Sequence, residues 1–289
     1  MTPAAFYLHD PEPLTSRVVF ASPHSGCDYP ASFLRASILD ERTIRSSEDA
    51  FVDRLFDCAP QFGAPLLRAA APRAYLDLNR ATDELDPALI DGVRRIGHNP
   101  RVASGLGVVP RVVAGGRAIY RGKLTRDEAE DRIARLWRPY HDRLQALLDR
   151  ARDRFGESIL IDCHSMPHEA IEGAGRSTRD KPEIVIGDRF GASASGRFVD
   201  SVEQSFANAG FRVVRNAPFA GAFTAQHYGR PSRHQHAIQI EIDRSLYMDE
   251  AGIRPHDGFA ELRHRLRAVI AGIAALGDAG TDNTRLAAE

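Results

Sequence analysis

Features that mark membrane, secreted or disulfide-stabilised proteins are scarce in this sequence. Its three cysteines, Cys27, Cys58 and Cys163, are too few and too scattered among 289 residues to form a disulfide framework. No stretch approaches the roughly 20 apolar residues that span a bilayer. The N-terminal residues include charged groups where a secretory signal would have an apolar core. We therefore expect a reduced, cytoplasmic setting and no membrane partner.

Lysine is almost absent, and the basic residues other than Lys123 and Lys181 are arginines. The formal net charge is only -1, and the arginines are interleaved with acidic residues along the chain, so we expect no basic face for nucleic acid. The glycine-rich loops that bind nucleotide phosphates do not occur either. The Gly-x-Ser-x-Gly turn that presents a nucleophilic serine is also missing. These absences favour a small-molecule enzyme that uses neither a nucleotide nor a serine nucleophile.

Strand and helix patterns alternate along the chain. This alternation predicts one α/β domain over residues 1–289 with three layers, a mixed, mostly parallel sheet flanked by helices. Its core is expected at about 17–276, followed by a loose tail at 277–289. Residues 81–122 show little periodicity and are expected to roof a crevice. We predict strands at 17–22, 65–70, 74–79, 158–164, 183–187, 212–215 and 237–243, and helices at 39–45, 49–58, 125–155, 194–209 and 257–276.

Two predicted strands run into a histidine at their carboxyl ends. His24 follows the strand at 17–22, and His164 ends the strand at 158–164. Ligands of open α/β sheets bind in the crevice beyond the carboxyl ends of the strands. An acid at the start of the helix at 49–58, either Glu48 or Asp49, would complete the three protein ligands of a catalytic zinc ion. The sequence thus predicts a zinc site at this edge of the sheet.

Other candidate residues would act beside the metal. Glu241 lies in an otherwise apolar strand pattern, where a buried carboxylate needs a partner or a task, and it is a plausible general base. Arg73 and Arg80 flank the segment at 74–79, and a guanidinium group can hold an oxyanion or a carboxylate. Asn79 beside Arg80 would make a compact carboxylate clamp. His227, in a loop rich in glycine and aromatic residues, either contacts substrate or braces that loop.

At these residues the chain resembles the N-formylglutamate amidohydrolase (N-formylglutamate deformylase) family. The matching stretches run in family order over most of the chain, from about residue 17 to 250. They are Ser22-Pro-His-Ser-Gly26, Glu48 to Leu55, Asp77-Leu-Asn-Arg80, Ile119-Tyr-Arg121, Pro139-Tyr-His141, Ile161-Asp-Cys-His-Ser165, Thr224 to Gly229, Gln239-Ile-Glu241 and Tyr247-Met-Asp-Glu250.

The resemblance implies kinship with zinc carboxypeptidases and aspartoacylases, and hence a phosphorylase/hydrolase-like fold with one zinc per chain. Those relatives take a carboxylate ligand from a His-x-x-Glu turn, whereas the third residue after His24 is Cys27. The family's matching acid falls on Asp49, with Glu48 as the alternative. By the same comparison Arg73 falls near the oxyanion-binding arginine of the aspartoacylases, and Glu241 matches their general base. The residues expected to bind substrate are Asn79, Arg80, Arg121 and His227.

The reaction that this resemblance implies is the hydrolysis of N-formyl-L-glutamate to formate and L-glutamate, a step of histidine degradation. Two alternatives remain open at this stage. The chain acts on another N-acyl amino acid or a cell-wall peptide fragment, or it is a ligand-binding relative that has lost turnover. We expect a small-molecule substrate and a monomer or small homo-oligomer.

Overall fold

The computed structural model describes residues 3–94, 99–172 and 181–276. A seven-stranded sheet runs through it in the order β1 (Phe6–His9), β3 (Leu66–Ala69), β2 (Val18–Ser22), β6 (Ser158–Met166), β9 (Gln235–Asp243), β7 (Ile184–Gly187) and β8 (Val213–Arg215). Within this sheet, as far as the described residues form it, only the β1–β3 and β7–β9 pairs are antiparallel. The predicted mixed, mostly parallel sheet is confirmed.

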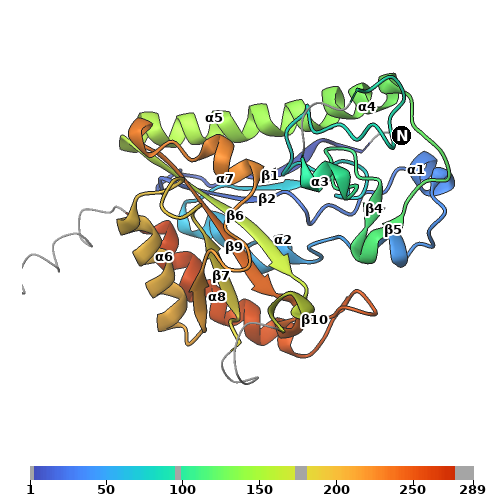
Figure 1. Cartoon of the computed structure of the whole chain (residues 1–289). Coiled ribbons are helices and arrows are strands. Elements are labelled where there is room, and N and C mark those ends of the chain that lie inside the picture. Colours follow the sequence, from blue (N-terminus) through green and yellow to red (C-terminus); the bar gives the residue numbers. More distant parts are fainter. Residues whose placement is uncertain (1–2, 95–98, 173–180, 277–289) are drawn as a thin grey trace, which may run out of the picture.

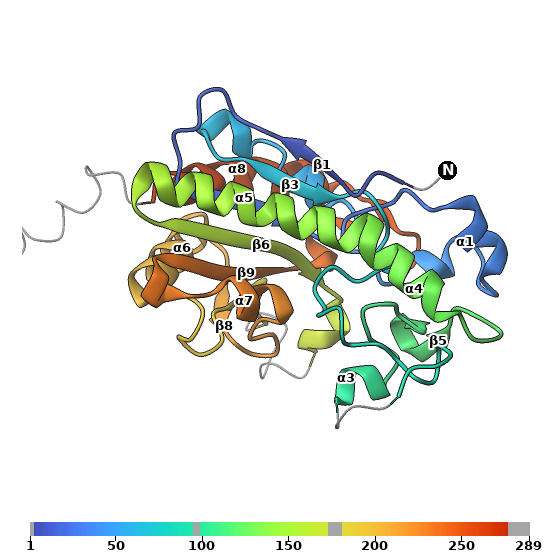
Figure 2. The ribbon, with the colours of Figure 1, turned by 90° about the horizontal axis from the view of Figure 1, so that it is seen from above.

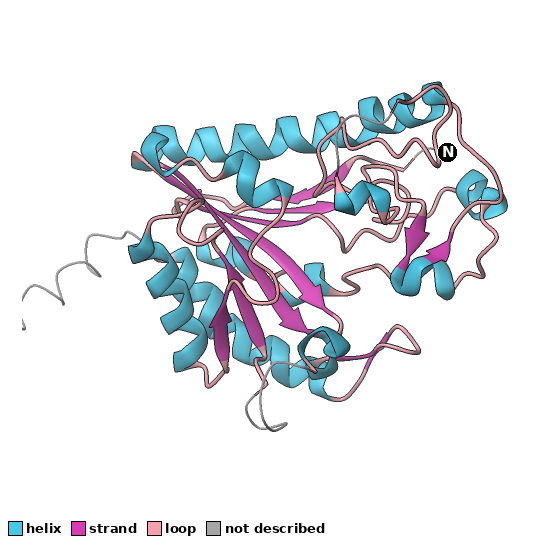
Figure 3. Ribbon diagram, in the orientation of Figure 1, coloured by secondary structure: helices cyan, strands magenta, loops and turns pink. Residues whose placement is uncertain are grey.

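Helices cover both faces of this sheet (Figures 1 and 3). One layer consists of α4 (Arg126–Arg132), α5 (Arg138–Phe155) and α7 (Phe223–Tyr228), and the other of α2 (Val52–Leu55), α6 (Gly196–Asn208) and α8 (Gly258–Ala274). Because side chains alternate along a strand, β6 contributes Leu160 to the first layer and Ile159 and Ile161 to the second. Burial of these two apolar layers stabilises the sheet between them.

The long helical pattern at 125–155 is confirmed as α4 and α5, which run over the sheet nearly as one helix (Figure 2). Thr125 and Glu128 form the predicted capping box. A π-helical segment at Ile133–Trp137 joins the two helices just before Pro139, where the sequence predicted a kink or a break. Gly156, with a φ of 79°, ends α5 in the left-handed conformation.

The segment at 74–79 is not the strand that its alternating apolar pattern predicted. It forms turns in which the amides of Tyr75 and Leu76 donate to the carbonyl of Pro72. The amide of Asp77 donates to the carbonyl of Val108, which belongs to the segment at 81–122. Three apolar side chains of the segment are buried in the core layer that also contains Val108, so the apolar alternation arises without a strand. They belong to Ala74, Leu76 and Leu78.

Several short elements complete the described chain. The sequence did not predict the edge strand β1 or the helix α1 (Ala31–Ala36), and the predicted helix at 39–45 is a single 3-10 turn, Thr43–Arg45. The remaining short elements are α3 (Pro100–Ala103), β4 (Val112–Val113), β5 (Arg117–Ala118), β10 (Met248–Asp249) and β11 (Arg254–Pro255). The predicted tail at 277–289 lies outside the described residues. No helix in the described ranges is long and apolar enough to span a membrane.

Candidate active site

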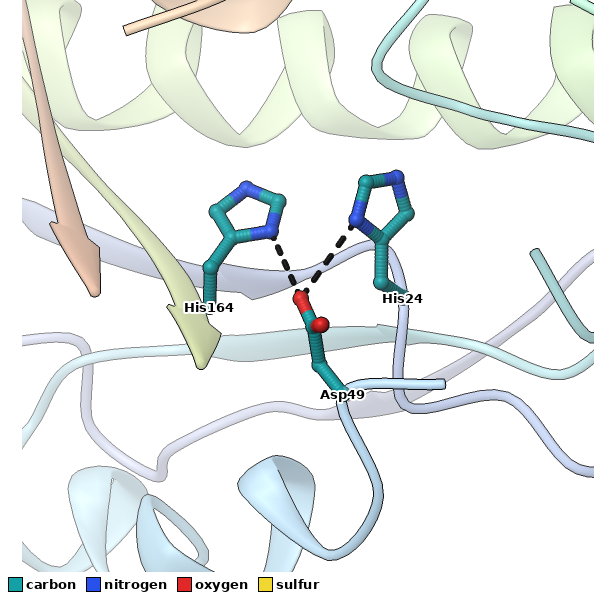
Figure 4. Close-up of side chains that lie close together, drawn as sticks. All are labelled: His24, Asp49 and His164. Carbon is teal, nitrogen blue, oxygen red and sulfur yellow. Dashed lines mark hydrogen bonds and ion pairs between the residues drawn. The ribbon is translucent and has the colours of Figure 1, made fainter. Parts of the chain in front are cut away.

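The side chains of His24, Asp49 and His164 meet near the carboxyl ends of β2 and β6 (Figure 4). Asp49 Oδ2 lies 2.9 Å from His164 Nδ1 and 3.4 Å from His24 Nδ1. One ligand atom from each residue can be chosen so that all three lie within 4.8 Å of one another, and all three residues are buried. The two predicted histidines and one predicted acid therefore form one cluster with the donor atoms of a zinc site.

Backbone contacts bring these three residues together. The amide of Asp49 donates to the carbonyl of His24 at 3.0 Å, which ties the two loops to each other. Phe51 then adopts the left-handed conformation, with φ 67° and ψ 3°, which turns the chain into α2. Gly26 lets the His24 loop approach its neighbour, because a Cβ there would lie 2.1 Å from the carbonyl oxygen of Ala71.

Asp49, rather than Glu48, is the acid that reaches the histidines. The carboxylate of Glu48 is held by Arg45, whose Nη2 donates to Oε2 at 2.9 Å, and by the hydroxyl of Tyr29. Asp49 Oδ1 accepts a hydrogen bond from Arg244 Nη2 at 2.9 Å, which leaves Oδ2 directed at the two imidazoles. Cys27 is exposed and is not part of the cluster. The structure thus favours Asp49 as the third ligand.

A second carboxylate faces the far nitrogen of each histidine. His24 Nε2 lies 2.7 Å from Asp77 Oδ1, and His164 Nε2 lies 3.0 Å from Asp162 Oδ2. Histidine ligands of metals commonly donate their other ring nitrogen to a carboxylate, which fixes the tautomer and orients the ring. With Nε2 of His24 donating to Asp77, Nδ1 of His24 carries a lone pair toward the centre of the cluster. Asp162 lies beside Nε2 of His164 without a hydrogen bond among the described residues.

The donor atoms of the cluster suit a metal ion. His24 Nδ1 is buried and makes no hydrogen bond within the described part of the chain. A buried polar atom without a partner is costly, and a metal ion bound between His24, Asp49 and His164 would supply that partner. Two imidazole nitrogens and a carboxylate oxygen match the ligand set of a catalytic zinc. The side chains of His24, Asp49 and His164 are therefore suited to bind a metal ion.

The charges within the cluster favour its ionised forms. Burial alone would raise the pKa of Asp49, but its hydrogen bond with His164 and the charges that His24 and His164 carry when protonated hold the pKa well below its usual range. Burial likewise opposes ionisation of Asp77, whose pKa the charges of Arg73 and His24 keep well below normal. Both carboxylates are ionised at neutral pH, as a ligand and its supporting partner must be.

Glu241 stands beside this cluster on the neighbouring strand. The β6–β9 register places Glu241 opposite His164, and Glu241 lines the same cavity. Gln239 Nε2 donates to Glu241 Oε1 at 2.9 Å. Burial raises the pKa of Glu241 to about 7, against the lowering effect of the charge of His164. A carboxyl group with a pKa near neutrality is suited to take up and return a proton.

Arg73, Asn79 and Arg80 all line the cavity. Arg73 Nε donates to Asp77 Oδ2 at 3.0 Å, and its terminal nitrogens make no hydrogen bond within the described ranges. Asn79 Nδ2 lies 3.3 Å from His164 Nε2, and its Oδ1 accepts from the amide of Thr224 at 2.8 Å. The Asn79 amide therefore supports His164 as well as facing the cavity.

The structure does not bring Arg121 or His227 to this cavity. Arg121 is exposed, and neither residue is among those that line it. His227 lies on α7, half-buried, where its ring stacks on Phe223 with centroids 5.0 Å apart. Of the two roles open to His227 from the sequence, this contact favours bracing the loop.

The cavity itself has a volume of about 540 Å³, within the usual range for small-molecule sites. The segment at 81–122, predicted to be a roof, supplies much of its wall from Arg101 to Gly116. Pro218 to Ala222, before α7, line another part of the wall and approach β7. Gly187 allows that approach, because a Cβ there would lie 2.7 Å from the carbonyl carbon of Ala220.

Three residues of the site had no role predicted from the sequence, namely Asp77, Asp162 and Arg244. Asp162 could have been found, because it precedes His164 by two positions and so shares its face of β6. Asp77 belongs to the matching stretch Asp77-Leu-Asn-Arg80, although its contact with His24 is not visible in that spacing. Arg244 carries no local signal, since its partner Asp49 lies 195 positions away.

Arg244→Met is expected to weaken metal binding by about 10- to 100-fold, the usual cost of removing a group that orients a metal ligand. Without the guanidinium group, Asp49 Oδ1 loses its 2.9 Å hydrogen bond and the carboxylate is free to rotate. Competition with a chromogenic chelator measures the affinity. Arg254→Met, which removes an exposed arginine paired with Asp249, is the matched control. Equal affinities in the two variants would contradict this role of Arg244.

Known proteins resemble this chain along most of its length. The family model described as N-formylglutamate amidohydrolase matches residues 16–248. An N-formylglutamate deformylase of Pseudomonas aeruginosa is 30% identical over 259 residues, covering 88% of this chain and 89% of the relative. One from Pseudomonas putida is 29% identical over 240 residues, covering 81% and 82%.

Two solved structures share the fold. The N-formylglutamate amidohydrolase of Ralstonia eutropha JMP134 superposes with a TM-score of 0.87 at 36% identity, covering 95% of this chain and 98% of that one. The gene product Atu2144 of Agrobacterium tumefaciens superposes with a TM-score of 0.64 at 17% identity, covering 93% of each chain. The second likeness concerns the fold alone.

Proposed function

This chain belongs to the N-formylglutamate amidohydrolase family, and from that premise we propose that it hydrolyses N-formyl-L-glutamate to formate and L-glutamate with one zinc ion. The observation that carries the proposal is the buried His24–Asp49–His164 cluster with Glu241 beside it in one cavity. The names of the relatives support the substrate, and the donor set supports the metal.

In the proposed reaction, Glu241 acts on the attacking water. Its carboxylate accepts a proton from the water as the oxygen attacks the formyl carbon, and it returns the proton to the amide nitrogen as the C–N bond breaks. Burial raises the pKa of Glu241 above that of an ordinary carboxyl group, which brings both transfers closer to neutral pH. Zinc bound by His24, Asp49 and His164 would lower the pKa of its water and polarise the formyl carbonyl.

Arg73 is suited to stabilise the negative charge that develops on the formyl oxygen. Asp77 fixes its Nε at 3.0 Å, so the guanidinium group is oriented before substrate arrives. Donors that are fixed in advance stabilise a developing oxyanion without reorganising during the reaction. Arg80, beside them, would hold a carboxylate of the substrate.

The proposal extends to the setting of the enzyme. A single domain is supported by one sheet whose two apolar layers draw on residues from both ends of the described chain. A reducing cytoplasmic setting is supported by the three free cysteines. We propose a monomer or small homo-oligomer that acts on a small molecule and requires neither nucleic acid nor membrane.

A formate-release assay tests the proposed reaction directly. Purified protein loaded with zinc should release formate from N-formyl-L-glutamate, and removal of the metal with a chelator should abolish the release. N-acetyl-L-glutamate and N-formyl derivatives of neutral amino acids serve as comparison substrates. Faster turnover of an N-acetyl substrate or a cell-wall peptide fragment would show that N-formyl-L-glutamate is not the preferred substrate.

Arg80→Lys is expected to raise KM for N-formyl-L-glutamate by about tenfold with a smaller change in kcat. Lysine keeps the positive charge but loses the planar fork that contacts a carboxylate at two points. It also loses the hydrogen bonds from Arg80 to the carbonyls of Leu106 and Asn79, so the melting temperature is measured alongside. An unchanged KM in a folded variant would place the carboxylate elsewhere.

A further inference from the structure

The charged groups around the cavity do not balance one another. Four arginines and three carboxylic acids line it. Arg244 pairs with Asp49 at 2.9 Å, and Arg73 pairs with Asp77 at 3.0 Å. The two remaining arginines, Arg80 and Arg101, have no carboxylate partner within the described residues.

Arg80 and Arg101 are fixed to the same point of the cavity wall. Arg80 Nε donates to the carbonyl of Leu106 at 3.0 Å, and the amide of Leu106 donates to the carbonyl of Arg101 at 2.8 Å. Burial lowers the pKa of Arg80, the charge of Asp77 raises it, and the smaller effects of Arg73 and Arg101 lower it further against the charge of Glu84. The wall therefore holds two cations that repel each other, an arrangement that an anionic ligand would relieve.

The segment that carries Arg101 is firmly attached. Asn99 caps α3 by accepting hydrogen bonds from two backbone amides, and its Nδ2 donates to Glu84 Oε2 at 3.0 Å. The amide of Val108 donates to the carbonyl of Glu84 at 2.9 Å. At Gly107 a Cβ would lie 2.4 Å from that carbonyl oxygen, so only glycine fits. The backbone of Arg101 is thus held in place before a ligand binds.

The two arginine side chains differ in how they are connected to the candidate metal ligands. Arg80 Nη1 donates to the carbonyl of Asn79 at 2.7 Å, and the Asn79 amide lies beside His164. The side chain of Arg101 makes no hydrogen bond within the described residues and is exposed at the cavity. In an N-acyl amino acid the α-carboxylate lies close to the scissile amide, whereas a side-chain carboxylate lies farther away. Arg80 therefore suits the first carboxylate and Arg101 the second.

We propose that Arg101 is a specificity-determining residue that binds the side-chain carboxylate of a dicarboxylic N-formyl amino acid. The proposal rests on the function proposed above and names the feature by which that site selects a dianionic substrate. A substrate with a neutral side chain leaves the Arg101 charge without a partner, so it gains less on binding. The selectivity between an acid and its amide thereby depends on one exposed guanidinium group.

The test compares two nearly isosteric substrates, N-formyl-L-glutamate and N-formyl-L-glutamine. Arg101→Gln is expected to lower kcat/KM for N-formyl-L-glutamate by about 10- to 100-fold, the effect of one charge-assisted hydrogen-bonded pair. The value for N-formyl-L-glutamine should change by less than about threefold. Arg101→Lys, which keeps the charge, should restore part of the preference. Arg94→Gln, an exposed arginine of the same segment that does not line this cavity, should change neither value.

A binding measurement separates this proposal from the proposed reaction. Calorimetric titration of both ligands into Glu241→Gln protein, with and without Arg101→Gln, reports selectivity without turnover. Wild-type protein that releases no formate would contradict the proposed reaction. If Arg101→Gln still removed the preference for the dianion in that case, the proposed role of Arg101 would be supported independently. Equal losses for both ligands, or an unchanged preference, would overturn the role of Arg101.

Discussion

Glu241→Gln is expected to lower kcat by about 10²- to 10⁴-fold, the usual contribution of general acid–base catalysis, while the protein keeps its zinc. Glutamine has nearly the same shape, and its side-chain oxygen can still accept the hydrogen bond from Gln239. It cannot take a proton from water or return one to the leaving amine. Turnover should therefore fail in a protein that still folds and binds substrate.

Three measurements make this result specific to proton transfer. Single-turnover kinetics give the chemical step, metal analysis gives the zinc content, and calorimetry gives the affinity for N-formyl-L-glutamate. Zinc content and affinity should match wild type, because Glu241 lies outside the His24–Asp49–His164 cluster. Loss of zinc would make Glu241 a ligand or the support of one. A kcat within tenfold of wild type would assign the base to another group.

The sheet and its histidines were predictable because they depend on short sequence patterns. The alternation along β6 places Ile161 and Cys163 on one face and His164 on the other, and this pattern is readable from neighbouring residues alone. The crossover from each strand to a helix then brings the carboxyl ends of β2 and β6 to the same edge. The meeting of His24 and His164 follows from the topology without knowledge of any side-chain contact.

The supporting contacts were not predictable, since they join segments that are distant along the chain. Arg244 reaches Asp49 across 195 positions, and Asp77 reaches His24 from a turn that resembles a strand in its apolar spacing. Arg80 and Asn79 were found by their position, but their hydrogen bonds to Leu106 and Thr224 depend on how the roof folds back. Abundant arginine further obscured which guanidinium groups face the cavity.

Asp49→Asn is expected to abolish stoichiometric zinc binding at neutral pH, and with it most of the activity. The change removes the negative charge that faces both histidines, at 2.9 Å from His164 and 3.4 Å from His24. It also leaves the buried guanidinium group of Arg244 without the carboxylate at 2.9 Å. The affinity should fall by more than the roughly 10- to 100-fold cost of losing an outer partner, because a direct ligand is lost.

Glu48→Gln is the matched control for this change, since it alters the neighbouring acid in the same way. Glu48 is paired with Arg45 outside the cluster, so its variant should keep zinc even where it loses some stability. Because breaking the Asp49–Arg244 pair also destabilises the fold, chelator competition is run on the folded fraction, with melting curves recorded for both proteins. Retained zinc in the Asp49 variant together with loss in the Glu48 variant would move the third ligand to Glu48. Equal retention in both would show that the two histidines bind the metal without either acid.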